Sequence, residues 1–468
     1  MCGIVGYAGN IETACGKPLE VCLQGLERLE YRGYDSAGVA LTAPGMDKVV
    51  VRKKAGRLKN LVEDIERKPM PLATVGIGHT RWATNGEPSD VNAHPHTSMD
   101  GKVAIIHNGI IENASQLRLD LQAEGYRFAS ATDTEVAAKL LGKIVDKIIA
   151  DEGKPDLFKA VRRMARMLEG AFTILATDCR QPDIVVGARH DSPLVVGLGE
   201  GENFLGSDVA AFVAYTKRAM EVDQDQAVCV SADKVIVTDF DGNVVENPKT
   251  YTVDWDASAA EKGGWDSFMD KEIHEDPAAV QRTLLGRFDA NGGITLDEVR
   301  IDEHDFKAID KIIVVACGTA SYAGQVAKYA IEHWVRIPVE IELAHEFRYR
   351  DPILTPRTLV VAISQSGETM DTLMALRHAR EQGSKVLAIC NTQGASIPRE
   401  SDAVLYTHAG PEVAVASTKA FVAQITAAYL LGLYLAQVKG AMAKCYSPLQ
   451  EICCRLLVRC LPRVKRWR

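Results

Sequence analysis

The sequence predicts two domains of different classes, an α+β domain built of layers and then an α/β domain with a parallel sheet. The chain has 468 residues, of which 47% are hydrophobic, and this is about three times the usual length of one domain. Before residue 246, short strand patterns are grouped around a few helices, whereas after residue 309 strands and helices alternate. The first arrangement is typical of layered α+β domains, and the second of parallel sheets covered by helices.

The predicted first domain covers residues 2–246. Its strand patterns are the apolar runs CGIVGYAG, SAGVALTA, KVVVRKKAG, TVGIGHTRWAT, KVAIIHNG, FTILATD and DIVVGARH. Helical patterns interrupt these runs at residues 133–149 and 157–168. Because strands and helices do not alternate regularly here, we expect layers and not a series of βαβ units.

A polar segment, residues 247–287, separates the two domains and is predicted to be an interdomain linker with some helix of its own. The second domain, residues 288–443, contains the apolar runs KIIVVACGT, PVEIELA, TLVVAIS, KVLAICN and AVLYTHA. Helical patterns at residues 321–335 and 370–382 lie between these runs. Continuous apolar strands are expected where helices cover both faces of a parallel sheet, so this domain is predicted to be doubly wound.

Two segments late in the sequence differ from their surroundings. Residues 420–438 are uncharged and just long enough to span a bilayer. They carry Gln424, Thr426 and Gln437 and follow an α/β pattern, so a buried core helix is expected. Residues 444–468 hold seven Lys or Arg, one acid and four of the eleven cysteines. This divergent basic tail resembles an out-of-frame translation product, and the alternative is a genuine basic tail.

Composition excludes several classes of protein. The net charge of -8 disfavours a nucleic-acid partner, because such binding relies on Lys and Arg at phosphates. The cysteines form no CxxC pair and are odd in number, so we expect neither a disulfide framework nor a metal site, and a reducing cytoplasm fits best. The N-terminus lacks a signal-peptide pattern, which predicts a mature chain beginning at Met1 or Cys2. Without GxGxxG a dinucleotide is disfavoured, and no cofactor and no membrane partner are predicted.

The first functional signal is Cys2, which is followed by Gly-Ile-Val-Gly. Its small side chain allows removal of Met1, after which one residue carries both a thiol and a free α-amine. The amine has an ordinary pKa of about 8, so it can take the thiol proton directly or through a water. Cys2 is therefore predicted to act as nucleophile and base, and the alternative is a small buried hydrophobic residue at a strand start.

Four further motifs contain groups that an amide hydrolase needs: LEYRGYDSAG at residues 29–38, GHTRWAT at 78–84, HNGIIEN at 107–113 and TDTEV at 132–136. Arg81 offers a planar fork to a substrate carboxylate, and Asp133 offers an anion to a substrate ammonium. Asn108 and Gly109 offer side-chain and backbone N–H donors to an oxyanion. Singly, an arginine after a strand is usually a surface residue, His107 fits a hydrogen-bonded core histidine, and Asn-Gly is often a turn.

Together with Cys2, these motifs resemble the glutaminase domain of class II glutamine amidotransferases, which has an N-terminal-nucleophile hydrolase fold. The second domain resembles a sugar isomerase (SIS) domain. The order of the two domains, over residues 2–443, is similar to the family of glutamine:fructose-6-phosphate aminotransferases (isomerizing), the glucosamine-6-phosphate synthases. Membership implies an enzyme that converts fructose-6-phosphate and glutamine to glucosamine-6-phosphate and glutamate in hexosamine and cell-wall precursor synthesis.

The resemblance implies roles for single residues of the first domain. It assigns catalysis to Cys2, Asn108 and Gly109, glutamine binding to Arg81, Thr84 and Asp133, a gate for ammonia to Trp82, and an outer supporting position to Arg32. Cys2 would form a glutamyl thioester whose oxyanion is held by the other two catalytic residues. Asn85 stands where the family often has His, so no role is carried over to it.

A second candidate site follows the strand TLVVAIS. Hydroxyls and backbone N–H groups at the start of a helix can hold an anion, although such a loop is equally an ordinary N-cap. CGTAS at residues 317–321 and VASTK at 415–419 also lie where strands or loops lead into helices, at the edge where open α/β sheets bind ligands. By resemblance, the fructose-6-phosphate ligands are Thr319, Ser364, Gln365, Ser366, Thr369 and Ser417. Ala320 stands where many relatives have Ser.

The family has two SIS domains, and the sequence shows one. We therefore expect a C-terminally truncated chain that retains glutaminase activity alone, since the acid and base for isomerisation belong to the missing domain. A homodimer of the family type is possible but weakened by that loss. The alternative is a non-catalytic regulator that binds sugar phosphate, or a non-functional fragment. The intact Cys2 and its surrounding motifs favour the enzyme.

Overall fold

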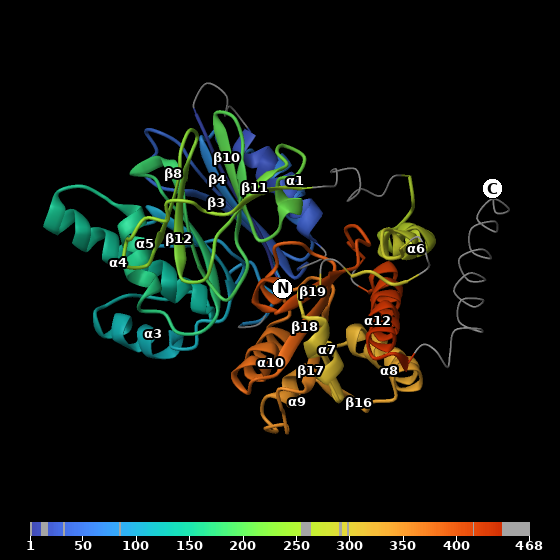
Figure 1. Cartoon of the computed structure of the whole chain (residues 1–468). Coiled ribbons are helices and arrows are strands. Elements are labelled where there is room, and N and C mark those ends of the chain that lie inside the picture. Colours follow the sequence, from blue (N-terminus) through green and yellow to red (C-terminus); the bar gives the residue numbers. More distant parts are fainter. Residues whose placement is uncertain are drawn as a thin grey trace. The chain divides into compact units, whose positions relative to one another are not determined.

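The computed structural model describes residues 2–10, 17–30, 33–83, 86–253, 264–289, 293–296, 299–414 and 416–441. The chain divides into two compact units, Met1–Glu261 and Lys262–Arg468 (Figure 1). The predicted tail at residues 444–468 and three residues with predicted or open roles, Arg32, Thr84 and Asn85, lie outside the described residues.

Two antiparallel sheets form the centre of the first unit. The order of the eight-stranded sheet is β14 (Thr250–Thr252), β11 (Arg218–Glu221), β9 (Val195–Leu198), β10 (Glu202–Gly206), β1 (Gly3–Gly9), β4 (Val75–Arg81), β2 (Ser36–Thr42) and β3 (Val50–Ala55). The order of the six-stranded sheet is β13 (Val235–Asp239), β12 (Gln226–Ser231), β8 (Gln181–His190), β7 (Phe172–Asp178), β6 (Val103–Gly109) and β5 (His96–Thr97).

The two sheets pack face to face, with helices on their outer faces. One buried cluster joins Ile4 and Ile77 of the first sheet to Ile106 and Leu175 of the second. The outer helices are α1 (Lys17–Leu29), α2 (Leu58–Arg67), α3 (Ala114–Ala123), α4 (Asp133–Glu152) and α5 (Leu157–Ala165). The first two share a core with the eight-stranded sheet, and the last three share one with the six-stranded sheet. The predicted layered α+β class is confirmed.

The segment predicted to be a linker, residues 247–287, is partly built into the two units. Its first part contains β14, which pairs with β11 in the first unit. Its last part contains helix α6 (Phe268–Leu284), which packs in the second unit against helix α12 (Lys419–Val438). The boundary between the compact units falls between these two elements.

A parallel sheet forms the centre of the second unit. Its five strands lie in the order β16 (Val339–Leu343), β15 (Lys311–Ala316), β17 (Thr358–Ser364), β18 (Lys385–Cys390) and β19 (Ala403–Tyr406). All four neighbouring pairs are parallel. The strand order reverses at β15, because the chain first places β16 on one side of it and then β17 to β19 on the other.

Helices cover both faces of this sheet. One face packs against α7 (Glu303–Ala308), α8 (Thr319–Val335) and α12. The other face packs against α9 (Ala344–Phe347), α10 (Met370–Glu381) and α11 (Ser396–Glu400). The doubly wound α/β class predicted from the continuous apolar strands is confirmed.

Helix α12 is long and apolar enough to cross a membrane, and in the described part of the chain it is the one helix that is. Figure 1 shows it beside α8 and α6, with which it makes extensive contacts. Ala427, Leu431 and Leu435 lie in the core between the helix layer and the sheet. The expected buried core helix is thus what the structure shows.

Candidate functional site

Cys2 lies at the start of β1, next to the end of the antiparallel strand β4. Gly3 pairs with Thr80 across the two strands, and this register brings the thiol to the turn after Arg81. The Trp82 N–H donates to Cys2 Sγ at 3.2 Å, and the thiol lies 3.6 Å from the Trp82 carbonyl oxygen. Burial raises the pKa of the half-buried Cys2 thiol, while the Trp82 N–H acts in the opposite direction.

Asn108 and Gly109 end β6, which belongs to the other sheet. Asn108 Nδ2 donates to the Cys2 carbonyl oxygen at 2.9 Å, so this amide lies directly against the predicted nucleophile. An amide NH2 has two N–H donors, which leaves a second one for a substrate oxygen. Gly109 has a φ of +116°, and a Cβ there would lie 2.0 Å from the Ala171 carbonyl oxygen. The backbone at this position therefore requires glycine.

Asp133 is the first residue of α4 and is buried. One carboxylate oxygen accepts the Ile111 N–H at 3.0 Å, and the other accepts the Thr134 N–H at 2.9 Å. These bonds fix the orientation of the carboxylate. The oxygen that accepts the Thr134 N–H also accepts a hydrogen bond from Thr134 Oγ1 at 3.4 Å. The other oxygen, Oδ2, has a further lone pair with which it can accept a substrate ammonium.

Arg81 is buried at the end of β4, and its Nη2 donates to the Gly86 carbonyl oxygen at 3.2 Å. Burial lowers the pKa of Arg81, whereas the thiol of Cys2 and the carboxylates of Asp133 and Asp35 act in the opposite direction. The site thus combines a fixed cation and a fixed anion with the thiol. This pairing matches the two charged ends of an amino acid.

Trp82 is 41% exposed and packs edge-on against Tyr34, with 5.3 Å between the ring centroids. The neighbouring Ala83 N–H donates to Asp35 at 2.8 Å, which anchors the chain after the Trp82 turn. Trp82 is thus a large exposed side chain whose own backbone contacts the Cys2 sulfur. Its predicted role as a gate for ammonia stays a prediction.

Four buried imidazoles lie behind the site: His79, His94, His96 and His107. The His94 ring centroid is 4.3 Å from that of His79, 5.3 Å from His96 and 6.5 Å from His107. Burial is the main cause that lowers the pKa of all four, to about 3 for His79. The four rings are therefore neutral at pH 7.

His79 holds the amide of Asn108, a contact that sequence reasoning missed. His79 Nε2 lies 3.1 Å from Asn108 Oδ1. Because Asn108 Nδ2 donates to Cys2, its Oδ1 faces His79 and can only accept, so Nε2 carries the ring proton. The motif GHTRWAT contained His79, but its partner lies in the other sheet. His107 bonds Thr134 Oγ1 at 3.0 Å, as expected of a hydrogen-bonded core histidine.

The second candidate site lies at the carboxyl edge of the parallel sheet. β15 and β17 are neighbours, and Ala316 lies opposite Ile363. Residues 317–319 follow the first of these strands, and Ser364 ends the second and is followed by the loop of residues 365–369. The strand order reverses at β15, and open α/β sheets bind ligands at such a switch point.

Hydroxyl groups hold the loop after β17 in a tight turn. Ser364 Oγ lies 3.1 Å from Thr369 Oγ1 and accepts the Gly367 N–H at 3.1 Å. Ser366 Oγ accepts the Glu368 N–H at 3.2 Å. Ser364 is buried, whereas Thr369, Ser366 and Gln365 are half-buried and Thr319, on the neighbouring loop, is exposed. These side chains lie around the edge, but several already bond within their own loop.

Ser417 holds a carboxylate of its own chain. Its Oγ donates to Glu412 at 3.0 Å, and Glu412 also accepts the N–H groups of Thr418 and Ala420. A carboxylate therefore caps the N-terminus of α12, where the sequence suggested an anion site. The assignment of Ser417 to sugar phosphate stays a prediction. Ala320, the position that differs from many relatives, packs against the core of the unit.

Known families match each unit of the chain. A glutamine amidotransferase domain matches residues 79–214, and a SIS domain matches residues 306–434. The glutamine–fructose-6-phosphate aminotransferase (isomerizing) of Corynebacterium diphtheriae is 63% identical over 444 residues, which are 94% of this chain and 70% of that protein. The chain belongs to this family.

One further curated relative and one solved structure are similar to the chain. The glutamine–fructose-6-phosphate aminotransferase of Streptomyces coelicolor is 60% identical over 440 residues, which are 94% of this chain and 69% of that protein. A solved C-terminal domain of glucosamine-fructose-6-phosphate aminotransferase from Francisella tularensis is 41% identical and covers 41% of this chain and 56% of that chain, with a TM-score of 0.38.

Membership of the glutamine–fructose-6-phosphate aminotransferase family fixes the class of the protein. It is an enzyme of the class II glutamine amidotransferase type, with an N-terminal-nucleophile α+β domain followed by an α/β SIS domain. Cys2, Arg81, Asn108 and Asp133 lie in the first of these domains, and the sugar-phosphate candidates lie in the second.

Proposed function

We propose that this member of the glutamine–fructose-6-phosphate aminotransferase family hydrolyses glutamine at Cys2 and takes fructose-6-phosphate at the edge of its SIS sheet. The observation that carries the first part is the set of contacts at Cys2. Its sulfur accepts the Trp82 N–H and its carbonyl oxygen accepts the Asn108 amide. Arg81 and Asp133 supply the two charges that glutamine needs.

The proposed reaction begins after Met1 has been removed. The free α-amine of Cys2 takes the thiol proton, directly or through a water, and the sulfur attacks the side-chain amide carbon of glutamine. The C–N bond breaks, ammonia leaves with the proton, and a glutamyl thioester remains on Cys2. Water then attacks the thioester carbon, which releases glutamate and restores the thiol.

Asn108 and Gly109 stabilise the oxyanion in both steps of this proposal. Asn108 is held on two sides, by the Cys2 carbonyl oxygen and by His79, so its amide is in place before substrate binds. A donor fixed in advance costs no reorganisation when the charge develops. Thr84 would assist in glutamine binding, Arg32 would support the site from outside, and Trp82 would control the exit of ammonia.

For the SIS domain, we propose that Thr319, Ser364, Gln365, Ser366, Thr369 and Ser417 hold the phosphate and sugar hydroxyls. All six are neutral at physiological pH, so none of them can take a proton from C1 of the ketose and return one at C2. We further propose that the 468-residue chain by itself releases ammonia, binds fructose-6-phosphate weakly and forms no glucosamine-6-phosphate.

The proposed location of the enzyme is the cytoplasm, and its proposed partners are glutamine, fructose-6-phosphate and a second copy of the chain. All six described cysteines are free thiols, which fits a reducing compartment. Neither a nucleic acid nor a membrane is proposed as a partner, given the net charge of -8 and the packing of α12 in the core.

The decisive experiment treats the purified chain with an electrophilic glutamine analogue and measures its mass. A protein that lacks Met1 and carries one label on Cys2 supports the proposal. An unlabelled protein that retains Met1 contradicts it and favours the sugar-phosphate-binding regulator. The same preparation, given glutamine and fructose-6-phosphate, is assayed for ammonia and for glucosamine-6-phosphate. Formation of glucosamine-6-phosphate by the chain alone would refute the proposed restriction to glutamine hydrolysis.

A further inference from the structure

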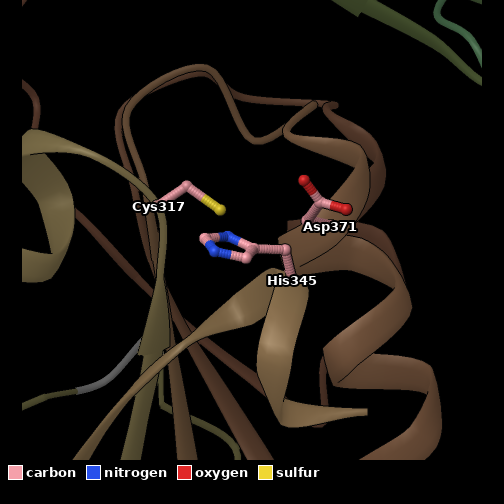
Figure 2. A group of neighbouring side chains, drawn as sticks. All are labelled: Cys317, His345 and Asp371. Carbon is pink, nitrogen blue, oxygen red and sulfur yellow. The ribbon is translucent and has the colours of Figure 1, made fainter. Parts of the chain in front are cut away.

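Three side chains of different ligand types meet at the carboxyl edge of the parallel sheet. The Cys317 sulfur, a ring nitrogen of His345 and a carboxylate oxygen of Asp371 all lie within 4.8 Å of one another. Figure 2 shows the sulfur and the imidazole facing each other, with the carboxylate beside them. Within the described part of the chain, this is the one group of Cys, His, Asp or Glu side chains with such spacing.

The three residues come from three neighbouring strands of the sheet. Cys317 directly follows β15, His345 lies in α9 after β16, and Asp371 lies in the first turn of α10 after β17. These strands are adjacent in the order β16-β15-β17. The parallel sheet therefore fixes the relative positions of the segments, although they are far apart in the sequence. The spacing of cysteines in the sequence does not reveal such a group, because its three ligands come from segments far apart in the chain.

Neighbouring groups prepare the cluster for a ligand. Thr372 Oγ1 donates to the Cys317 sulfur at 3.8 Å. Burial raises the pKa of this thiol, and the hydrogen bond from Thr372 acts in the opposite direction. Such hydrogen bonds support a thiolate that ligates a metal. Glu346 Oε1 lies 3.8 Å from His345 Nε2, so a small side-chain rotation brings this carboxylate within hydrogen-bond distance of the ring. A carboxylate at the second ring nitrogen is a common partner of metal-bound histidines.

We propose that Cys317, His345 and Asp371 bind one thiophilic divalent cation of the Zn2+ type. Thiolate and imidazole ligands favour zinc and disfavour Mg2+ and Ca2+, which take oxygen ligands. A tetrahedral zinc site places such ligand atoms roughly 3.3–3.6 Å apart, so a pair at the 4.8 Å limit has to close by about 1 Å around the ion. His345 and Asp371 are exposed, and exposed side chains can make this adjustment by rotation about their own bonds.

Three protein ligands leave a fourth position open to water or to another oxygen. Cys317 stands two residues before Thr319, and Asp371 stands two residues after Thr369. The cation therefore joins the two loops that are proposed to hold the phosphate, and its charge attracts the phosphate dianion. We infer that fructose-6-phosphate and the cation each tighten the binding of the other by the same factor. This coupling, unlike the cation site itself, rests on the proposed function.

The experiment measures Zn2+ binding by competition with a coloured chelator, in a full-length reference variant. In this reference, Cys2, Cys15 and the four cysteines of residues 444–468 are replaced by Ser, so that these thiols do not compete. Co2+ serves as a spectroscopic probe, because a cysteine ligand gives it a thiolate charge-transfer band. The test variants are Cys317→Ser, His345→Ser and Asp371→Asn. The controls are Cys229→Ser and His333→Ser, which alter a half-buried cysteine and an exposed histidine outside the cluster.

We expect the reference to bind one Zn2+ and to show the cobalt band. Cys317→Ser should remove the band, and each test variant should weaken Zn2+ binding by more than the about 10- to 100-fold that is typical of losing an outer partner. Equal Zn2+ affinity in the reference and in Cys317→Ser or His345→Ser would overturn the site. His345 is exposed, so its variant tests the site without endangering the fold.

A second measurement separates this inference from the proposed function. The affinity for Zn2+ is compared with and without saturating fructose-6-phosphate. Tighter Zn2+ binding in its presence supports the coupling between the two ligands. Zn2+ binding that does not change with the sugar phosphate leaves the cation site standing and overturns the coupling. Failure of fructose-6-phosphate to bind at all, measured by calorimetry, counts against the proposed function and not against the cation site.

Discussion

The two candidate sites of this enzyme are organised in opposite ways. At Cys2, polar groups from both sheets are buried and already bonded to one another, as in the chain of contacts from His79 through Asn108 to Cys2. At the edge of the SIS sheet, Thr319 is exposed and Ser366 is half-buried. The hydroxyl groups there bond mainly within their own loop.

This difference shows where each site obtains its order. A buried polar network must be satisfied by protein groups, since an unpaired buried group is costly, and it is therefore rigid before substrate arrives. Exposed loop hydroxyls have water as an alternative partner, so the bound phosphate can supply much of their order. Substitutions at Cys2 and its neighbours should consequently have large effects on the reaction, and those at the sheet edge smaller effects on binding.

The largest effect is expected for Cys2→Ala. The substitution deletes the attacking atom, so ammonia release from glutamine should fall by about 1,000-fold or more. The fold should survive, because one half-buried sulfur is lost and the backbone bond from Asn108 to the Cys2 carbonyl oxygen remains. Cys229→Ser, in strand β12 of the same unit, is the matched control. Turnover of Cys2→Ala close to that of the control would exclude the thioester mechanism.

The next largest effect is expected on glutamine affinity, from Arg81→Lys and Asp133→Asn. Each removes one charge-assisted contact to the substrate, worth about 1.5–3 kcal/mol, so KM should rise about 10- to 100-fold. In Asp133→Asn, the new amide NH2 also faces one of the two backbone N–H groups that the carboxylate accepted. Because this can destabilise the fold, the melting temperature of the variant is measured as well. Asp120→Asn, on the exposed face of α3, is the control. A normal KM in Arg81→Lys would disprove the assigned pocket.

The same contrast explains what the sequence could predict of the fold. In the second unit, all five strands of the sheet and the long helices α8, α10 and α12 were predicted, because strands buried on both faces are continuous apolar runs. Helix α6 lies in the segment that was predicted to be a linker with some helix. In the first unit α1, α2 and α3 were not predicted, and α1 contains Pro18 and Gly25, which disfavour a helical pattern. Gly25 is present for packing: a Cβ there would lie 2.8 Å from the Ala211 carbonyl oxygen. Tertiary contact, and not helix propensity, selects this glycine.

For the sites, the sequence revealed chemistry but not contacts. Cys2, Asn108 and Asp133 could be predicted as site candidates from their motifs, because a nucleophile, an oxyanion donor and an anion together suit few functions other than amide hydrolysis. The bond from His79 to Asn108 joins two sheets, and the bond from Ser417 to Glu412 places a carboxylate where an anion ligand was expected. Both are tertiary contacts between side chains, and neither residue spacing nor hydrophobic periodicity contains them.

His79→Leu tests whether the network at Cys2 is organised in advance. Without the imidazole N–H, Asn108 Oδ1 loses its donor and the amide is free to turn. We expect kcat for glutamine to fall, up to the about 100- to 1,000-fold cost of losing one oxyanion donor, while KM changes little. His79→Gln supplies another amide N–H and should restore part of kcat. If the loss of kcat is explained by a loss of folded protein, and His79→Gln restores none of it, the role of His79 is structural alone.

Acid should disable the first unit before the second. The pKa of His79 is lowered by burial from 6.5 to about 3, and the pKa values of His94, His96 and His107 are also lowered. The unfolded chain therefore binds more protons than the folded chain below pH 6.5. The free energy of unfolding of the first unit is therefore highest above pH 6.5. It decreases as the pH falls toward the pKa values that the histidines have in the folded chain. Urea unfolding at pH 7 and pH 5 checks this order, with fluorescence measured in one variant that keeps Trp82 as its single tryptophan and in another that keeps Trp334, which lies in α8 of the second unit. Unchanged stability between the two pH values would contradict it.

The smallest effect is expected at the sheet edge, from Ser364→Ala. Ser364 Oγ accepts the Gly367 N–H and contacts Thr369, so its loss loosens the turn in addition to removing a hydroxyl. A neutral hydrogen bond contributes about 1 kcal/mol, and the Kd for fructose-6-phosphate should therefore rise only about 5-fold. Glutamine hydrolysis should not change, because Ser364 and Cys2 belong to different compact units. The control is Ser401→Ala. Ser401 directly follows α11, and its hydroxyl donates to the Ile397 carbonyl oxygen. Calorimetric titration with fructose-6-phosphate measures the change. A 100-fold loss of binding would mean that this edge is as rigidly built as the site at Cys2, and the contrast between the two sites would then fail.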